Sequence, residues 1–436
     1  METGAFYPFA PIRAVAAFAP AAGPLPVSWR RMADLQIHDV LIIGGGLVGA
    51  SLALALDRAG VAATLLEATP PAAMPEVFDQ RNLSFAEATV NALGALGVMA
   101  RLRRAPGEIR RIHISRAGDF GQACLRASDF GRTAFGRVVV ARDLGEALEA
   151  GLAEAGTITR LRPLRFLGFD EGRDAGLQHV RVAGAEGERV LAARLVVAAD
   201  GADSQVRRAA GIGADTHDYG QRLFVAKLRT QQAPDGTAYE RLGDAGPTAL
   251  LPRGDGSYGL VHGVATDDAD RVAALGARDF LARVQDVFGW RAGRFLEVGE
   301  RSAYPAQRVV AARTTARRVV LVGNAAQALH PIGAQGFNLG LRDALTLAEL
   351  LGGADDPGAA ALLDAYVRRR QEDRRRTLAF SDGLARITAN PAPLLRPLRS
   401  LGLTALGAVP ALQSMLAGGA MGYRGHVPAL CRGAGA

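Results

Sequence analysis

The folded part of the chain opens at His38 with the stretch HDVLIIGGGLVGASLALALDRAGVAATLLEA. Its apolar run VLII predicts a buried parallel strand, and the small and apolar residues that follow predict a helix. Between them Gly44, Gly46 and Gly49 have the G-x-G-x-x-G spacing. One glycine allows a tight turn, one the close approach of backbone to a pyrophosphate, and one the packing of helix on strand. The stretch therefore predicts a dinucleotide-binding loop at the start of a Rossmann-like α/β fold.

This loop is completed by a second predicted strand, residues 63–66, which ends in Glu67. A carboxylate at this place accepts hydrogen bonds from the hydroxyls of an adenosine ribose. The diphosphate would lie on the N-terminus of the helix, where N–H groups and the helix dipole attract anions. The loop alone does not distinguish FAD from NAD, so the choice depends on the rest of the chain.

Length and composition exclude several classes of protein. A chain of 436 residues is long enough for two domains, or for one α/β domain with an insertion. The net charge is +8, but Lys227 is the single lysine, aromatic residues make up 6%, and no basic run is interleaved with aromatics. This argues against a nucleic-acid partner. Cys124 and Cys431 lie far apart and show no metal-ligand or CxxC spacing, which fits a reducing cytoplasm and no metal site.

Residues 1–36 are rich in proline and alanine and lack periodicity. A signal peptide is one interpretation because Arg13 precedes an apolar stretch, but prolines interrupt that stretch and Glu2 stands where positive charge is expected. We expect a disordered extension, with Met32 as the true initiator. Elsewhere no segment has the roughly 20 uninterrupted apolar residues of a membrane span.

A second segment, RLVVAADGADSQVRRAAG, repeats the pattern of a strand that ends in a turn. Residues 195–199 predict the strand, Asp200 and Gly201 the turn, and 204–210 a helix. An acidic residue and a glycine at the carboxyl end of a parallel strand face the crevice where α/β sheets bind ligands. An ordinary Asp-Gly turn is the alternative.

A third segment, ARRVVLVGNAAQALHPIGAQGFNLGLRDALTLAELL, predicts a strand over 319–322 and a helix from about Phe337. The side-chain oxygen of Asn324 can accept a hydrogen bond from a hydroxylated linker. Gly333, Gly336 and the amides after them would lie at a helix N-terminus. Such a terminus suits a group that becomes negative on reduction, as the N1–C2=O edge of a flavin does. We therefore expect this segment to hold the flavin ring and the first loop to hold the adenine end of FAD.

In this order and spacing, the three segments resemble the class A flavin-dependent aromatic hydroxylases, over about residues 37–416. Within that family the chain resembles the ubiquinone-biosynthesis branch, and the form GNAAQ-LHP resembles its 2-polyprenyl-6-methoxyphenol hydroxylase subgroup. The resemblance implies an α/β fold: a Rossmann-like FAD-binding domain of the glutathione-reductase type, an inserted, mostly β substrate domain, and a C-terminal helical segment.

The expected domains follow from this architecture. The substrate domain is expected to contain strands at 223–228, 249–251 and 258–264 and a helix at 279–288. The domain boundaries that we expect are 37–215 and 306–350 for the FAD-binding domain, 216–305 for the substrate-binding sheet, and 351–436 for the C-terminal helical region.

The resemblance also implies roles for individual residues. In DQRNLSF, Arg81 would reach the flavin side, and in ARDLGEAL, Arg142 would lie near the FAD diphosphate. The stretch AYERLGDAGPTALLP, residues 238–252, is similar to strands that roof the substrate cavity. The cofactor-binding residues that we expect are Gly44, Gly46, Gly49, Glu67, Arg81, Arg142, Asp200, Gly201, Asn324, Pro331, Gly333, Gln335, Gly336 and Asn338.

Two departures from the family pattern stand in the third segment. Most class A hydroxylases have Gly-Asp where this chain has Gly323 and Asn324. The family turn Pro-x-Ala-Gly-Gln-Gly has its alanine and glycine exchanged here, as Gly333 and Ala334. If position 334 needs a positive φ, alanine there is strained.

The implied chemistry is that of an FAD-dependent oxidoreductase. NAD(P)H reduces FAD, O₂ adds to form a C4a-hydroperoxide, and its distal OH attacks the electron-rich ring of a polyprenylated phenol. No second G-x-G-x-x-G provides a separate nicotinamide domain, which fits transient docking of NAD(P)H. His330 and Gln327 are candidates to contact flavin or substrate. No residue is identified as the base that ionises the phenol.

The C-terminal region begins with a charged helix whose run Arg368–Arg376 we expect to be a solvated face. The apolar stretch after it, PLLRPLRSLGLTALGAVPALQSMLAGGAMG, is expected to contact a membrane surface or a second copy, or to pack on its own domain. A cytoplasmic enzyme that binds the inner face of the cytoplasmic membrane, with other ubiquinone-biosynthesis enzymes as partners, fits this pattern. The alternatives are an FAD monooxygenase for a small soluble aromatic and a non-catalytic FAD-binding scaffold on membranes or RNA.

Overall fold

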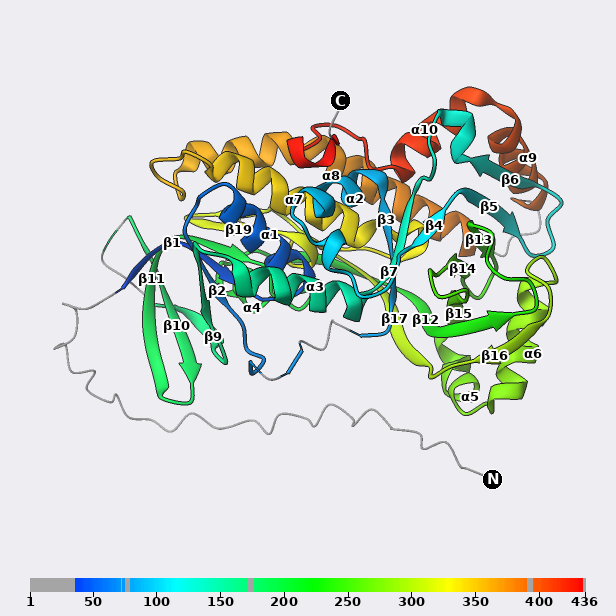
Figure 1. Cartoon of the computed structure of the whole chain (residues 1–436), viewed down its shortest axis with the longest axis horizontal. Coiled ribbons are helices and arrows are strands. Elements are labelled where there is room, and N and C mark those ends of the chain that lie inside the picture. Colours follow the sequence, from blue (N-terminus) through cyan, green and yellow to red (C-terminus); the bar gives the residue numbers. More distant parts are fainter. Residues whose placement is uncertain are drawn as a thin grey trace. The chain divides into compact units, whose positions relative to one another are not determined.

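The computed structural model describes residues 36–71, 73–74, 79–170, 174, 176–389 and 395–433. Apart from Gln36, the expected N-terminal extension and Met32 lie outside the described residues. Figure 1 shows two large sheets, with helices packed against each of them.

The first sheet is built around β1 (Ile37–Ile43), which pairs in parallel with β11 on one side and β2 on the other. Its order is β18-β19-β11-β1-β2-β8, and β10 and β9 extend it in antiparallel fashion from β11. The strands run over Ala63–Leu66 (β2), Ile158–Leu161 (β8), Arg165–Asp170 (β9), Gln178–Gly184 (β10), Gly187–Ala198 (β11), Thr315–Ala316 (β18) and Val319–Leu321 (β19). Both faces of β1 are buried, which explains its continuous apolar run.

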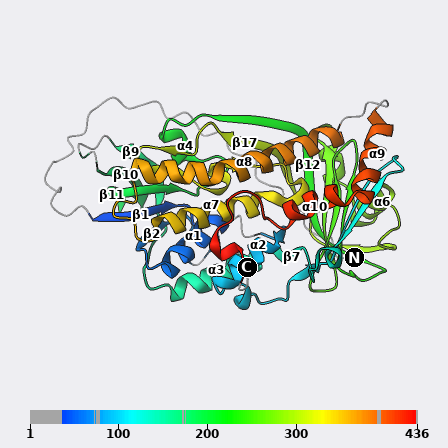
Figure 2. The ribbon, with the colours of Figure 1, turned by 90° about the horizontal axis from the view of Figure 1, so that it is seen from above.

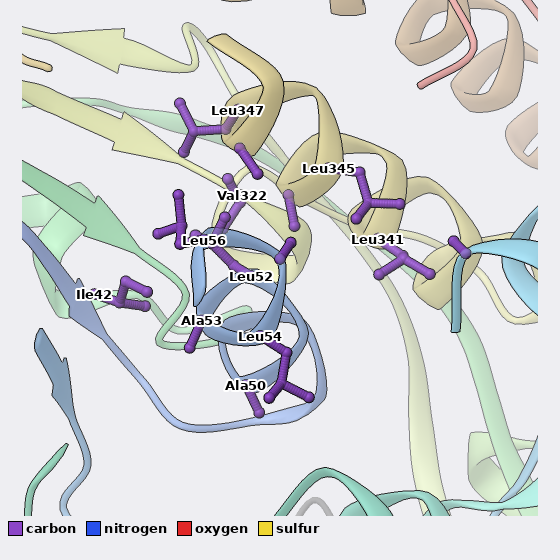
Figure 3. Close-up of a cluster of buried hydrophobic side chains, with 14 of the residues drawn as sticks. Ile42, Ala50, Leu52, Ala53, Leu54, Leu56, Val322, Leu341, Leu345 and Leu347 are labelled. Carbon is purple, nitrogen blue, oxygen red and sulfur yellow. The ribbon is translucent and has the colours of Figure 1, made fainter. Parts of the chain in front are cut away.

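Helices α1 (Leu47–Arg58) and α7 (Gln335–Leu351) cover one face of this sheet. Figure 3 shows Leu52 and Leu56 of α1 packed with Val322, the residue directly after β19, and with Leu341 and Leu345 of α7. The two helices come close because small residues lie between them. A side chain at Gly340 would place its Cβ only 2.8 Å from the Cα of Gly323. The start of α7 is therefore held directly over the turn that follows β19.

The second sheet has the order β20-β17-β12-β15-β14-β13-β5-β6, with β16 paired to β12. Its bounds are Arg111–Arg116 (β5), Gln122–Arg126 (β6), Ala214–Thr230 (β12), Thr237–Leu242 (β13), Thr248–Pro252 (β14), Tyr258–Ala265 (β15), Phe295–Val298 (β16), Ser302–Ala311 (β17) and Gln327–Ala328 (β20). β5 and β6 come from residues 111–126, so this sheet draws on chain outside the expected range 216–305. One of its faces buries Phe224 and Leu260 against Phe280 and Val284 of α6 (Ala277–Phe288).

A small third sheet and the remaining helices complete the structure. The third sheet has the order β3-β7-β4. In the chain, its three strands lie between β2 and β8 of the first sheet. Its strands and the other helices are β3 (Asn82–Ala86), β4 (Gly107–Ile109), β7 (Gly136–Val140), α2 (Glu87–Ala95), α3 (Ala141–Glu154), α4 (Gln205–Ala209), α5 (Ala269–Ala273), α8 (Ala360–Ala389), α9 (Leu395–Ala408) and α10 (Pro410–Ala420). Where these ranges overlap the expected strands and helices, the type of element is as predicted.

The charged face of α8 differs from our expectation. Helix α8 runs beside α7 (Figure 2), and Arg370 and Asp373 are only 2% and 0% exposed. The Nε of Arg370 lies 2.7 Å from Oδ1 of Asp343, and the Nε of Arg342 lies 2.6 Å from Oδ2 of Asp373. The prediction of a solvated face was wrong for these residues because α7 presents opposite charges to them. Burial alone raises the pKa of Asp373, but the two arginines bring it below its usual range.

Removal of one member of this cluster should therefore destabilise the fold strongly. We expect Asp373→Ala to lower the free energy of unfolding by about 3–5 kcal/mol, because it leaves Arg342 and Arg370 buried with one carboxylate between them. Glu372→Ala is the matched control, since Glu372 forms an exposed pair with Arg376 and should cost less than about 1 kcal/mol. Urea denaturation measures both values. Equal losses in the two variants would contradict this account.

Candidate active site

The turn between β1 and α1 leaves room for a ligand backbone but not for side chains. Gly44 has φ of 108°, and a Cβ there would lie 2.5 Å from the carbonyl oxygen of Ala199. A Cβ at Gly49 would lie 2.0 Å from the carbonyl oxygen of Gly44. Gly46 is the N-cap of α1 and offers no side chain to cap it. The first amides of α1 thus form an open anion site of the kind that holds a diphosphate.

Glu67 shapes this turn. Its Oε2 accepts a hydrogen bond from the amide of Gly45 at 2.7 Å, and its Oε1 accepts one from the amide of Thr69 at 2.7 Å. Each carboxylate oxygen has more than one acceptor site, so the carboxylate can hold the loop and still accept from a ribose hydroxyl. Contact of Glu67 with the ribose stays a prediction.

Asp200 and Gly201 follow β11, as expected, and Gly201 has φ of 90°. The Asp200 carboxylate accepts from the hydroxyl of Ser204 at 2.5 Å and from the amide of Val206 at 3.0 Å, so it stabilises the start of α4. Burial raises the pKa of Asp200 above the usual range. Sequence reasoning missed Arg207, which is buried and donates to the carbonyl oxygen of Ala325 at 3.0 Å. Arg207 thereby ties this turn to the segment that contains Asn324.

The structure brings Arg81 and Arg142 together through Asp79, which was not singled out in the sequence. The amide of Arg142 donates to the carbonyl oxygen of Asp79 at 2.9 Å. The Asp79 carboxylate accepts from the amide and the Nε of Arg81 at 2.8 and 3.0 Å, and from the hydroxyl of Tyr304 at 2.6 Å. The guanidinium carbon of Arg81 lies 4.9 Å from the centroid of the Tyr304 ring. Burial and the Asp79 charge raise the pKa of Tyr304 to about 12.

The third segment forms the turn that precedes α7. Asn324 lies in the short helix η4 (Gly323–Ala325) and its side chain is exposed, so its oxygen is accessible to a ligand. Gly333 has φ of 71° and Ala334 has φ of 50°. Position 334 is thus left-handed, and an alanine there costs about 1–2 kcal/mol. Helix α7 starts at once after Ala334 without a side-chain cap, two residues before the expected start at Phe337.

Gln335 and Asn338 are engaged with the protein itself. The Nδ2 of Asn338 donates to the carbonyl oxygens of Ser84 and Ala334 at 2.9 and 2.8 Å. Its Oδ1 accepts from the amide of Ala86 at 2.9 Å and from the hydroxyl of Thr89 at 2.7 Å. Gln335 donates to the carbonyl oxygen of Gly333 at 2.9 Å. These side chains hold the turn onto β3 and α2, so a contact of residue 338 with a cofactor would come from its backbone.

His330 and Gln327 are likewise occupied. Gln327 donates to Asp343 at 2.6 Å and accepts from the Nε of Arg374 at 2.9 Å. The Nδ1 of His330 accepts from the amide of Ile332 at 3.1 Å, and its Nε2 lies 3.3 Å from Oε1 of Gln221. Burial lowers the pKa of His330 to about 4, so the ring is neutral at pH 7. The structure therefore gives both side chains a part in holding the turn and leaves neither free to take a proton from a substrate.

The predicted roof, residues 238–252, covers β13, the following turn and β14. Leu242 at the end of β13 packs with Ile332 and with Ile114 of β5. Ile332 lies in the turn before α7, residues 330–334, which we call the flavin turn after its predicted role. This contact places one face of the second sheet against the turn before α7. The residues of that face near the turn are Leu223 and Val225 on β12, Ala249 on β14, Val261 on β15 and Ile114 on β5, which are apolar.

The glycine turn permits a direct test of cofactor binding. We expect Gly49→Ala to lower FAD affinity about tenfold or more, because its Cβ would overlap the carbonyl oxygen of Gly44. Gly94→Ala is the matched control, since a Cβ at Gly94 in α2 meets nothing within 4 Å and alanine favours a helix. The ratio of bound FAD to protein, read from the visible flavin absorbance, checks the result. Normal FAD content in Gly49→Ala would contradict the assignment of this turn.

Comparisons with known proteins agree with this geometry. A family model described as an FAD binding domain matches residues 38–381. The ubiquinone hydroxylase UbiL of Rhodospirillum rubrum is 35% identical over 418 residues, which cover 94% of this chain and 95% of that protein. The 3-demethoxyubiquinol 3-hydroxylase of Escherichia coli is 29% identical over 378 residues, which cover 85% of this chain and 95% of that protein.

Among solved structures, p-nitrophenol 4-monooxygenase PnpA of Pseudomonas putida aligns with a TM-score of 0.73 at 21% identity, over 87% of this chain and 96% of that chain. This similarity confirms the predicted fold of an FAD-binding domain, a β-rich substrate domain and C-terminal helices. The open anion site at α1, together with the turn before α7, fits FAD. The chain therefore belongs to the FAD-binding monooxygenases, in their ubiquinone-hydroxylase family, and is an FAD-dependent aromatic-ring hydroxylase.

Proposed function

We propose that this enzyme hydroxylates the ring of a polyprenylated phenol in ubiquinone biosynthesis, with NAD(P)H as the reductant. The observation that carries the proposal is the apolar sheet face next to the flavin turn, which suits a ring with a hydrocarbon tail. The names of two relatives, a ubiquinone hydroxylase and a demethoxyubiquinol hydroxylase, support it. Because residues 323–331 resemble the 2-polyprenyl-6-methoxyphenol hydroxylases, we propose that phenol as the substrate.

Bound FAD supplies the activation of O₂ in this reaction. One oxygen atom enters the ring, the ring hydrogen leaves as a proton, and the other oxygen leaves as water while NAD(P)H is oxidised. The protein binds and orients the phenol and excludes water from the flavin ring. The apolar character of the sheet face argues against the alternative of a small, strongly polar aromatic substrate.

The lipids of a strain that lacks the gene provide the test. We expect a 2-polyprenyl-6-methoxyphenol to accumulate and ubiquinone to be lost, as measured by mass spectrometry of the quinone-pathway lipids. Wild-type protein should restore ubiquinone, and Gly49→Ala should restore less of it, because we expect its FAD affinity to be lower. Normal ubiquinone in a strain without any other ring hydroxylase would exclude this pathway. In that case NADPH oxidation by purified protein with soluble phenols would test the alternative substrate class.

The C-terminal helices supply a surface for the lipid substrate. In the described residues no single helix is long and apolar enough to cross a bilayer, and the apolar pair Pro397–Ala408 and Pro410–Ala420 is bent by 86°. Figure 1 shows α9 and α10 beside β5 and β6. The exposed large apolar side chains of this pair, which we call the apolar patch, are Leu398, Leu401, Val409, Leu412 and Met415. Phe120, 74% exposed, lies next to Gly121, which packs on Ser400 of α9.

We propose that the apolar patch rests on an anionic bilayer surface, since an apolar face on a chain of net charge +8 fits that partner. The double variant Leu401→Glu with Met415→Glu should weaken binding of the FAD-loaded protein to vesicles of anionic phospholipid about tenfold or more, because two charges would enter the apolar layer. Leu296→Glu, at a 50% exposed leucine on β16, is the control. Co-flotation measures binding. If the double variant binds vesicles as well as wild type does, the apolar patch is not the membrane-binding surface. If wild type is a dimer and the double variant is not, the patch contacts a second copy instead.

A further inference from the structure

We propose that Glu240 contacts the ring hydroxyl of the phenol and accepts its proton during hydroxylation. This role rests on the proposed function, because it needs a phenol as the substrate. Glu240 lies in the middle of β13, in the stretch AYERL. No residue of the third segment provides such a base, since His330 and Gln327 hold the turn instead.

The alternation of side chains along the second sheet places Glu240 on the substrate side. On β13, Tyr239 faces α6 and its cluster of buried aromatic residues. Ala238 and Leu242, each two residues away from Glu240, pack on the opposite side of the sheet. Because side chains alternate along a strand, Glu240 shares that side. It is the side on which Leu242 touches Ile332 of the flavin turn.

The cross-strand neighbours of Glu240 are apolar. Ile114 of β5 and Ala249 of β14 stand directly opposite it in the sheet. The cluster around Ala238 contains Ala417 and Met421 from the region of α10, and the cluster around Leu242 contains Ile332. Glu240 is thus the acid between two apolar clusters, one beside the C-terminal helices and one beside the flavin turn.

Glu240 lacks the partners that usually accompany a carboxylate in such surroundings. Among the described residues, none donates a hydrogen bond to it or forms an ion pair with it. The residue as a whole is half-buried. A carboxyl group without a protein partner is costly to bury, and it persists where a ligand supplies the missing bond. Burial also raises the pKa of Glu240 to about 7, which suits a proton acceptor that works near neutral pH.

Among the described residues, no ionisable group on the neighbouring elements forms an ion pair with Glu240. Helix α10 and strand β14 contain none. On the remaining elements, the ionisable groups that have partners of their own include His330 with Gln221, Tyr219 with Asp382, Asp382 with Arg386, Arg116 with Asp244, Lys227 with Asp255, and Arg253 with Asn82.

The proposed proton transfer makes the ring more reactive at the step that needs it. The O–H bond of the phenol breaks, an O–H bond forms on the Glu240 carboxylate, and the electron pair left on the phenol oxygen enriches the ring. The oxygen that enters the ring comes from O₂, and the electrons come from NAD(P)H. When the ring loses its hydrogen as a proton and the phenol oxygen regains one, Glu240 is ionised again. The carboxylate is therefore needed at the start of each cycle.

The test uses the FAD-loaded enzyme, NADPH and a short-chain probe, 2-methoxy-6-prenylphenol, together with the O-methyl ether of that probe. Hydroxylated product and NADPH consumption are measured separately. We expect Glu240→Gln to retain FAD and to oxidise NADPH, but to form product about 100-fold more slowly. In wild type, the rate of product formation should fall as pH drops below about 7, because the carboxylate becomes protonated. The rate of the variant should not show this fall. Glu300→Gln, at an exposed glutamate outside the site, should behave as wild type.

Binding and stability provide two readouts that do not depend on turnover. Wild type should bind the phenol more tightly than its O-methyl ether, and Glu240→Gln should lose this preference. The folded wild type holds the Glu240 proton up to about pH 7, whereas the unfolded chain releases it near the ordinary value of 4.5. Wild type should therefore lose stability relative to Glu240→Gln as pH rises between these values.

The outcomes separate the two proposals. If wild type with bound FAD neither binds nor hydroxylates the probe, the proposed function fails and the role of Glu240 fails with it. If wild type hydroxylates the probe and Glu240→Gln does so at the same rate and with the same pH profile, Glu240 is excluded while the proposed function stands. The role as proton acceptor is also overturned if Glu240→Gln forms product more slowly but keeps the fall in rate below about pH 7 and the preference for the phenol over its O-methyl ether.

Discussion

The burial of α7 is the constraint on which the rest of the structure depends. This helix is packed against α1 on one side and against α8 on another, and it contains Arg342 and Asp343 at 1% and 2% exposure. Two buried charges are tolerated only where opposite charges and hydrogen bonds meet them. Arg370 and Asp373 of α8 meet that requirement, so α8 has to lie where it does. The position of the flavin turn follows, because the turn leads directly into α7.

The same packing joins the two ends of the cofactor site. Val48, in the first turn of α1, lies in the space that side chains at Gly323 and Gly340 would occupy. The helix N-terminus suited to the diphosphate and the one suited to the flavin ring are therefore held by one contact. Neither helix has a side-chain cap, so both present their first amides to a ligand. Such preorganised amides bind negative charge without a further change of the protein.

The proposed substrate site rests on the second sheet and not on the turn before α7. The flavin turn is held by bonds within the protein, and its histidine is neutral and engaged. In the part of the chain that the structure describes, Glu240 of this sheet has no hydrogen-bond or ion-pair partner, and it shares the side of the sheet on which Leu242 packs with Ile332. The proposed division of cofactor binding and substrate recognition thus follows the two sheets, and the chain passes from one to the other where β19 of the first sheet is followed by η4 and by β20 of the second.

Much of the fold and of the cofactor site could be predicted from the spacing of residues that lie close in sequence. The glycines of the first loop, Glu67 after its strand, and the order of strand, turn and helix in three segments could be predicted because each depends on residues close in sequence. The exchange of alanine and glycine at positions 333 and 334 is visible in the sequence, but only the structure shows that Ala334 has a left-handed backbone. The tertiary structure decided the rest: the burial of Arg370 and Asp373, the occupied side chains of Gln327 and Asn338, the recruitment of β5 and β6, and the isolation of Glu240. In each case the state of a polar group or strand depends on partners from distant segments, and no local pattern of residues specifies them.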